Sequence, residues 1–278
     1  MGLRINTNIA SQEVQRNLRA SSAEQETEFA RLSSGKRITK SADDAAGLAI
    51  SKKLEASTKG VKMAARNANN AISMVQVAEG GLNESTNILT RLRELSVQAG
   101  SDTVGDQERG FLNMEYQQLT QELERIAVTT EFNGTSLLKG DSGNGTLDFQ
   151  VGAYGGQENR IQFDASGTDA TVENLGVDGT NIQSKEDAWD NMSRIDQAID
   201  KVSGFRANLG AMQSRLQSTM NTLEITAVNQ DNARSRIEDT DYAESSAKIA
   251  SINIMKSAGT AVLAQANDLP MSALKLVS

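Results

Sequence analysis

Between Thr58 and Ala99 the chain reads TKGVKMAARNANNAISMVQVAEGGLNESTNILTRLRELSVQA. Apolar or small side chains recur there every three or four residues, the spacing that places them on one face of an α-helix. A first row comprises Ile72, Val75, Ala78, Leu82, Ser85, Leu89, Leu92 and Leu95, and a second row comprises Ala71, Met74, Val77, Gly81 and Ile88. Two adjoining rows indicate burial between several partners. About 40 helical residues span roughly 60 Å, so this stretch predicts a long helix inside a bundle.

Two more long helices are expected after this one. Residues 100–105 are typical of a turn, with Asp106 as the cap of a second helix. Its expected buried face comprises Phe111, Met114, Leu119, Leu123 and Ile126. A third helix is expected over about 187–228, with a face formed by Met192, Ile195, Ile199, Val202, Leu209, Met212, Leu216, Leu223 and Ile225. Long helices joined by short turns favour an antiparallel bundle.

The middle of the chain has a different pattern. Apolar and polar residues alternate over 146–151 and again over 160–163, on either side of a glycine-containing turn at 153–156, which predicts a β-hairpin. The segment 141–148 weakly resembles a Ca²⁺ loop, but glycines stand at the third and fifth ligand positions, which favours a plain turn. The expected fold is therefore mainly α, a long antiparallel helical bundle or coiled coil built from both chain ends with a small β-hairpin in the middle.

Both chain ends carry sparse apolar rows. The first end has Ile5, Ile9, Val14, Leu18, Phe29 and Leu32, and the last has Tyr242, Ile249, Ile252, Met255, Val262, Leu263 and Leu269. Isolated helices are marginal in water, and neither row is bulky enough to bury itself. We therefore expect the two ends to fold on each other and on further copies of the same chain.

The composition excludes several kinds of active site. The 278 residues include no Cys and no His, so thiolate nucleophiles, thiolate metal sites and Ser-His-Asp triads are excluded. The pair Asp43-Asp44 is interpreted as a helix cap in preference to a catalytic carboxylate pair. The first nine residues lack the apolar run of a secretory signal, and no stretch approaches the length of a spanning helix. The sequence predicts no enzyme, no cofactor, no metal site and no membrane insertion.

Several motifs resemble one protein family. They are INTNI at 5–9, RLSSGKRI at 31–38, ADDAAGLAI at 42–50, ARSRIEDTDYA at 233–243 and VLAQAN at 262–267. Their order and content are similar to the amino- and carboxy-terminal signatures of bacterial flagellins. The similarity covers both terminal blocks, about four fifths of the chain. The middle is short, which implies that a large variable outer domain is missing.

The resemblance implies a structural subunit that self-assembles into the flagellar filament for motility, by coupled folding of its ends. It implies a terminal coiled-coil domain from 1–40 and 238–278 that forms the filament core. Residues 41–237 would form an outer helical domain with the hairpin near 146–164. The implied partners are further copies of the chain, an export chaperone, a type III export apparatus, and the cap and junction proteins, but no nucleic acid. The implied location is the extracellular filament.

One segment suggests a second kind of partner. Residues 89–98, LTRLRELSVQ, resemble the segment by which many flagellins engage a Toll-like receptor, although Thr90 stands where Gln is common. The implied recognition residues are Leu89, Arg91, Glu94, Leu95, Gln98 and Glu115. The other interpretation is that the leucines belong to the core and that Arg91 and Glu94 are merely solvated. The sequence leaves both open.

Three alternatives remain for the whole chain. A hook–filament junction protein shares such terminal helices and would form a short ring in place of a long filament. A carboxylate-based hydrolase would need acids that converge on an apolar pocket. A nucleic-acid-binding coiled coil would show strongly salt-dependent binding to DNA. The scattered acids and the interleaved charges of the first 66 residues favour neither of the last two.

Overall fold

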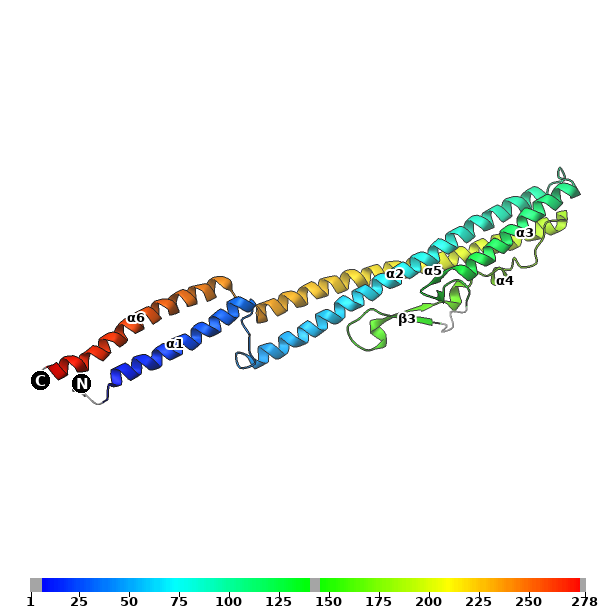
Figure 1. Cartoon of the computed structure of the whole chain (residues 1–278). Helices are drawn as coiled ribbons and strands as arrows, with labels where there is room; N and C mark the ends of the chain where they lie inside the picture. Colours follow the sequence, from blue (N-terminus) through cyan, green and yellow to red (C-terminus); the bar gives the residue numbers. More distant parts are fainter. Residues whose placement is uncertain (1–6, 141–145, 276–278) are drawn as a thin grey trace. The chain divides into compact units, whose positions relative to one another are not determined.

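The computed structural model describes residues 7–140 and 146–275, the side chains of 269–275 excepted. The chain divides into two compact units, Ser57–Val228 and a second one formed by Met1–Ala56 with Asn229–Ser278. The long helices are α1 (Ile9–Ser34), α2 (Ala45–Ala99), α3 (Asp106–Thr129), α5 (Lys185–Glu238) and α6 (Tyr242–Lys275) (Figure 1). Helices α2 and α5 each contribute residues to both units. The mainly helical fold predicted from the sequence is confirmed.

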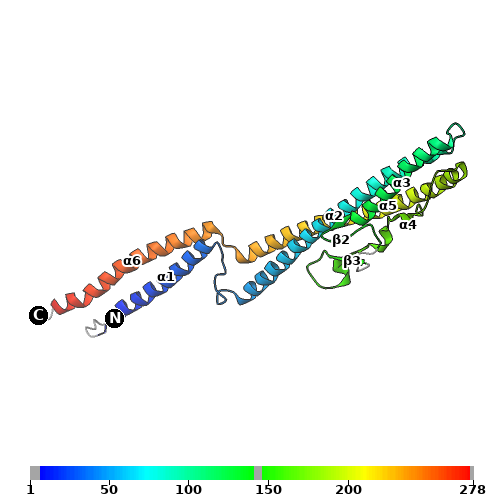
Figure 2. The same ribbon diagram turned by 45° about the vertical axis from the view of Figure 1, so that its right-hand side comes forward.

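In the Ser57–Val228 unit, α2, α3 and α5 run side by side, as two views agree in showing (Figures 1 and 2). The first row predicted on α2 is buried from Val75 to Leu95, with only Ile72 partly exposed. In the second row Val77 is the exception, since it is 40% exposed. The rows thus face α3 and α5, and their burial supplies the main apolar stabilisation of this unit.

Helix α3 buries the second half of the predicted face but not its start. Leu123 and Ile126 are buried and Leu119 packs against the core, whereas Phe111 and Met114 are exposed. The face that packs inward also includes the buried Tyr116 and the partly buried Leu112. The prediction was wrong for Phe111 and Met114 because the first turns of α3 bury polar groups: Arg109 donates from Nε to the carbonyl of Ala99 at 2.9 Å and closes the end of α2. The same kind of miss occurs on α5, where Ile225 is exposed.

The predicted hairpin is present in the middle of the chain. Strands β3 (Thr146–Gln150) and β4 (Arg160–Asp164) pair antiparallel, with Leu147 opposite Phe163 and Phe149 opposite Ile161. These four side chains belong to the unit's core cluster. A second two-stranded pair, β1 (Glu131–Phe132) with β2 (Thr135–Ser136), and the short helix α4 (Val172–Leu175) were not expected. Residues 141–145 of the Ca²⁺-like segment lie outside the described residues.

In the other unit, α1 and α6 pack against each other along their lengths (Figure 1). The segment between α1 and α2 is held by the two neighbouring aspartates. Asp44 accepts from the backbone N–H of Gly47 at 2.8 Å and so caps α2, as predicted. Asp43 instead accepts from the backbone N–H groups of Thr39 and Lys40 at 2.9 Å, and these bonds lower the pKa of its carboxyl.

Candidate assembly surfaces

The contact between α1 and α6 combines polar and apolar groups. The Asn8 side chain donates to the carbonyl of Ala266 at 2.7 Å, and Gln25 donates to the Asn253 side chain at 2.6 Å. Leu18 packs directly on Gly259, where an added Cβ would lie 2.8 Å from a Leu18 methyl group. This contact leaves several large apolar side chains of both helices about half exposed or more, so those side chains are not covered within the chain.

The apolar residues predicted for self-assembly divide into three groups. Ile252 is buried, and Leu18, Leu32, Ile249 and Leu263 are half-buried. Ile9, Phe29 and Val262 are about half exposed, at 57%, 52% and 49%. Ile5 and the side chain of Leu269 lie outside the described residues.

The sequence rows missed one strongly exposed aliphatic side chain of α6. Ile254 is 71% exposed and stands beside Met255, which is 49% exposed. The signal was present in the sequence, because Ile252, Ile254 and Met255 cannot all point to the same side of one helix. The exposed side chains Ile9, Phe29, Ile254, Met255 and Val262 are together called here the end-helix apolar surface.

A buried carboxylate joins the connection α1–α2 to the junction of α5 and α6. Glu238, only 4% exposed, accepts hydrogen bonds from the Lys36 ammonium and the Ser51 hydroxyl. These two partners lower the pKa of the Glu238 carboxyl. The backbone adds the Arg37 N–H to the Glu238 carbonyl at 2.7 Å and the Thr240 N–H to the Gly35 carbonyl at 3.1 Å. We call this arrangement of Glu238, Lys36 and Ser51 the Glu238 cluster; Lys36 and Glu238 stand in the motifs at 31–38 and 233–243, but the sequence did not predict that they pair.

The residues predicted for receptor recognition lie at two depths. The Arg91 guanidinium pairs with Glu115 and Glu94, at 2.8 Å each, and Gln98 is exposed on the same helix, α2. The pairing with Glu115 is one cause of the raised pKa of Arg91, after the hydrogen bond to Glu94. Leu89 and Leu95 are fully buried in the core. Only the polar members of the predicted set are therefore available to a partner.

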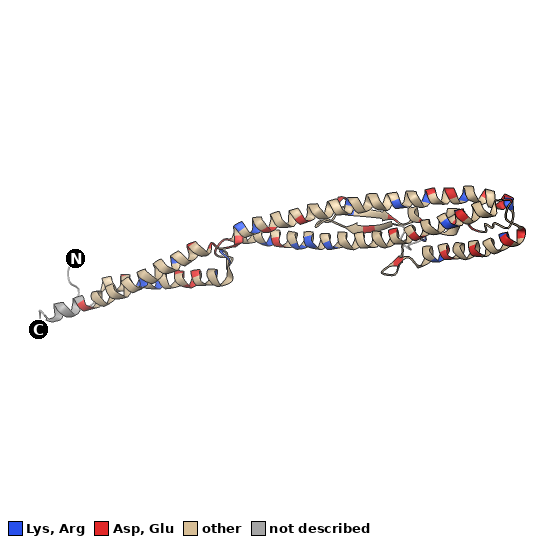
Figure 3. Cartoon of the chain, turned by 90° about the horizontal axis from the view of Figure 1, so that it is seen from above, with Lys and Arg blue, Asp and Glu red and all other residues tan. Residues whose placement is uncertain are grey.

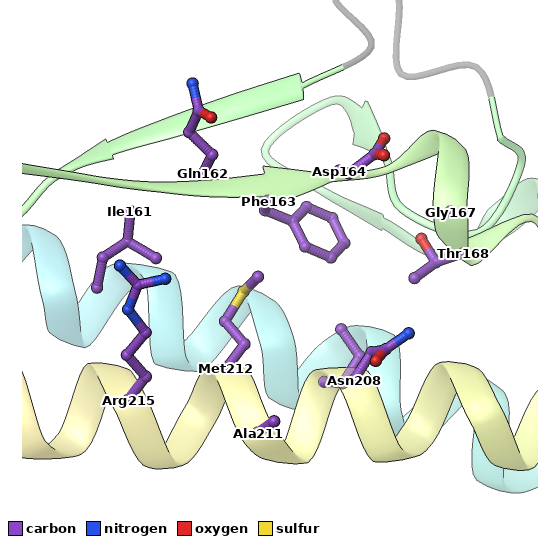
Figure 4. Close-up of a pocket in the computed structure, with 11 residues that line it drawn as sticks. Ile161, Gln162, Phe163, Asp164, Gly167, Thr168, Asn208, Ala211, Met212 and Arg215 are labelled. Carbon is purple, nitrogen blue, oxygen red and sulfur yellow. The ribbon is translucent and has the colours of Figure 1, made fainter. Parts of the chain in front are cut away.

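Figure 4 shows a groove between strand β4 and helix α5 in the Ser57–Val228 unit. Ile161, Phe163, Leu209 and Met212 line this hairpin groove, whose volume is about 400 Å³. Its one carboxylate, Asp164, accepts from the backbone N–H and the hydroxyl of Ser166, which lower the pKa of the carboxyl. A lone carboxylate held in this way does not provide the acid–base pair that a carboxylate hydrolase requires.

Three features of the described residues bear on nucleic-acid, metal and membrane binding: the distribution of charge, the grouping of acidic side chains and the hydrophobicity of the helices. Acidic and basic residues are interspersed along the ribbon in Figure 3, and this view shows no continuous basic stripe along a helix. Within residues 7–140 and 146–275, no three acidic side chains gather closely enough to hold a metal ion. Over the same part of the chain, every helix is too short or too polar to cross a bilayer.

Comparisons with known proteins agree at both ends of the chain. The family described as the bacterial flagellin N-terminal helical region matches residues 5–142, and the bacterial flagellin C-terminal helical region matches residues 192–277. A flagellin of Halalkalibacterium halodurans is 39% identical over 98% of this chain and 99% of its own length. The crystal structure of Bacillus cereus flagellin is 27% identical, with a TM-score of 0.51 over 57% of this chain and 88% of that one.

A structure from Vibrio parahaemolyticus, described as a flagellar hook-associated protein, also superimposes. Its TM-score is 0.58 over 71% of this chain and the whole of that one, but the two sequences are only 13% identical. Identity that low shows a shared fold and does not favour the junction-protein alternative over the flagellin resemblance.

Proposed function

Since this chain belongs to the bacterial flagellin family, it is a structural subunit of the flagellar filament and not an enzyme, and we propose that the end-helix apolar surface drives its polymerisation. The observation that carries the proposal is the exposure of Ile9, Phe29, Ile254, Met255 and Val262 on the two end helices, although α1 and α6 pack against each other. Neighbouring copies cover these side chains in the filament. The filament serves motility.

The energetics favour assembly coupled to folding. Burial of a few hundred Å² of apolar surface per end, at about 25 cal/mol per Å², contributes several kcal/mol. Ordering of the ends offsets part of this gain. In the free subunit the end helices gain too little from each other to stay folded, and they become ordered as copies add to the growing filament.

Each of two domains has its own role in this proposal. Residues 1–40 and 238–278 form the terminal coiled-coil domain of the filament core, and residues 41–237 form the outer domain with its hairpin. Export through a type III apparatus, with an export chaperone, places the subunit outside the cell, where the cap and junction proteins contact the filament. A chain without cysteine is compatible with export in an unfolded state.

Truncation and point variants test the assembly proposal. Deletion of residues 1–30 or 250–278 should leave a soluble, partly helical chain that forms no filaments in negative-stain microscopy. Phe29→Ser and Ile254→Ser should raise the critical concentration for polymerisation, whereas the exposed polar control Asn17→Ser should not. Normal filaments from the truncated chains would contradict the proposal.

The polar surface on α2 and α3 supports recognition by a Toll-like receptor. Arg91, Glu94 and Glu115 are exposed and linked by ion pairs, and Gln98 is exposed on α2 beside them. Leu89 and Leu95 act by supporting α2 from the core. A reporter-cell assay tests this with the monomer. Arg91→Ala and Glu115→Ala should reduce the response, and Arg125→Ala, which removes a different surface pair with Glu122, should not. The proposed recognition would be refuted if the reporter cells respond to a control flagellin but not to the monomer of this chain.

A further inference from the structure

The hairpin groove has an apolar floor and one unused cation at its rim. Figure 4 shows Phe163 of β4 and Met212 of α5 facing each other across the groove, with Arg215 one turn further along α5. The Arg215 guanidinium makes no hydrogen bond or ion pair with the described part of the chain. The groove therefore suits an occupant that presents an apolar side chain and a carboxylate close together.

Such a group is displayed on the outer face of α3. Phe111 and Met114 are 58% and 59% exposed and lie one turn apart, although the same helix buries Tyr116 completely. Glu108 lies one turn before Phe111, and its carboxylate forms no ion pair with any described residue. We call Glu108, Phe111 and Met114 the α3 knob. It is complementary to the groove in both polarity and charge.

The knob cannot reach the groove of its own chain. Lys185, the first residue of α5, pairs with Asp102 at 2.7 Å, and the Trp189 ring lies against Gly100 at the end of α2. The start of α3 is therefore at the start of α5. Met212 follows Trp189 by 23 residues, about 35 Å along the helix axis. Phe111, within two turns of the start of α3, falls far short of that position.

We propose that the α3 knob of one copy docks in the hairpin groove of the next, with Phe111 between Phe163 and Met212 and Glu108 on Arg215. The proposal rests on the polymerisation of this chain and names one contact that the polymer uses. Because the two surfaces differ, two copies joined by this contact still have one unoccupied knob and one unoccupied groove. A contact between two different surfaces extends as an open helical filament when the rotation from copy to copy does not close into a ring.

Disulfide trapping tests the contact directly, because the natural chain contains no cysteine. Met114→Cys and Ala211→Cys place one thiol on the knob and one on the exposed rim of the groove. After polymerisation and mild oxidation, the double variant should run as a ladder of multimers on a denaturing gel, and each single variant as a monomer. The matched control pair, Val128→Cys with Ala211→Cys, should give no ladder.

Two results would overturn the proposal while leaving polymerisation intact: filaments without a ladder, or an equal ladder from the control pair. If the double variant does not assemble, the two cysteines are placed on separate chains and mixed with an excess of the natural chain. A single dimer band is then expected, and its absence from the resulting filaments refutes the contact.

Charge exchange provides a second readout. Glu108→Arg should raise the critical concentration for polymerisation by roughly threefold to fivefold, since it opposes Arg215 with a like charge. Glu108→Arg combined with Arg215→Glu should restore the natural value. An unchanged critical concentration in the single variant, or no restoration in the double variant, would contradict the pairing.

Discussion

At the scale of single residues, the Glu238 cluster shows how one buried carboxylate organises a connection. Its carboxyl is almost inaccessible to water and is therefore stable as an ion only with its two donors, Lys36 and Ser51. Removal of either donor leaves a buried charge short of a partner. Two of its members, Lys36 and Glu238, lie within the motifs at 31–38 and 233–243, so those motifs have a structural explanation in this unit.

Glu238 gives the cluster a defined dependence on pH. Its pKa in the folded chain lies below the ordinary value of 4.5, so the ion contributes stability above that value and loses it as the pH falls through the folded pKa. Glu238→Gln should cost about 1–3 kcal/mol near neutral pH and should flatten the loss of stability below pH 4.5. Thermal unfolding of filaments from pH 7 to pH 3 measures both effects.

The matched control is Glu244→Gln, which changes an exposed carboxylate paired with Lys248 at 3.0 Å. This variant should keep the natural stability and the natural slope below pH 4.5. If the stability of the Glu238→Gln variant falls with pH in the same way as that of the natural chain, the Glu238 cluster does not cause the loss of stability in acid.

At the scale of elements, α2 carries two adjacent glycines with opposite surroundings. An added Cβ at Gly80 would meet nothing within 4 Å, whereas one at Gly81 would lie 2.8 Å from both Leu138 and the hydroxyl of Thr130. Gly81 therefore permits close approach of the segment after α3 to the helix. Gly80 only weakens the helix, since glycine loses more backbone entropy on folding than alanine does.

Alanine at these two positions should change stability in opposite directions. Gly80→Ala should stabilise the Ser57–Val228 unit by up to about 1 kcal/mol. Gly81→Ala gains the same propensity but must displace Leu138 and Thr130, at a cost of about 1–3 kcal/mol. Melting temperatures followed by circular dichroism compare the two variants, and a higher melting temperature for Gly81→Ala than for Gly80→Ala would contradict the packing argument.

The elements also show how far the sequence alone leads. Helical spacing predicted α2, α3 and α5, and alternation predicted β3 and β4, because these elements repeat their pattern over several turns or residue pairs. The pair β1–β2 was missed although Asn133-Gly134, with Asn133 at φ 51°, is a strong hairpin signal over a very short span. Only the start of the buried face of α3 was missed, because Arg109 and Asn113 are buried there and periodicity assigns polar residues to the surface.

For the whole molecule, the two units differ in how they satisfy their apolar surface. The Ser57–Val228 unit encloses a continuous core shared by three helices and the hairpin. In the other unit, α1 and α6 leave large aliphatic and aromatic side chains about half exposed or more. A subunit with one self-sufficient part and one incomplete part is suited to polymerise, since its incomplete part gains stability only from further copies.

Hydrogen exchange should reveal this asymmetry. In a dilute monomer, the amides of α1 and α6 should exchange almost as fast as those of an unfolded chain, because two helices that leave large apolar side chains exposed open at little cost. Amides in the core of the Ser57–Val228 unit should exchange at least about a thousandfold more slowly. In filaments both end helices should become protected as well. A monomer in which α1 and α6 are as well protected as α2 would mean that the ends fold without neighbours, and coupled folding would then not drive assembly.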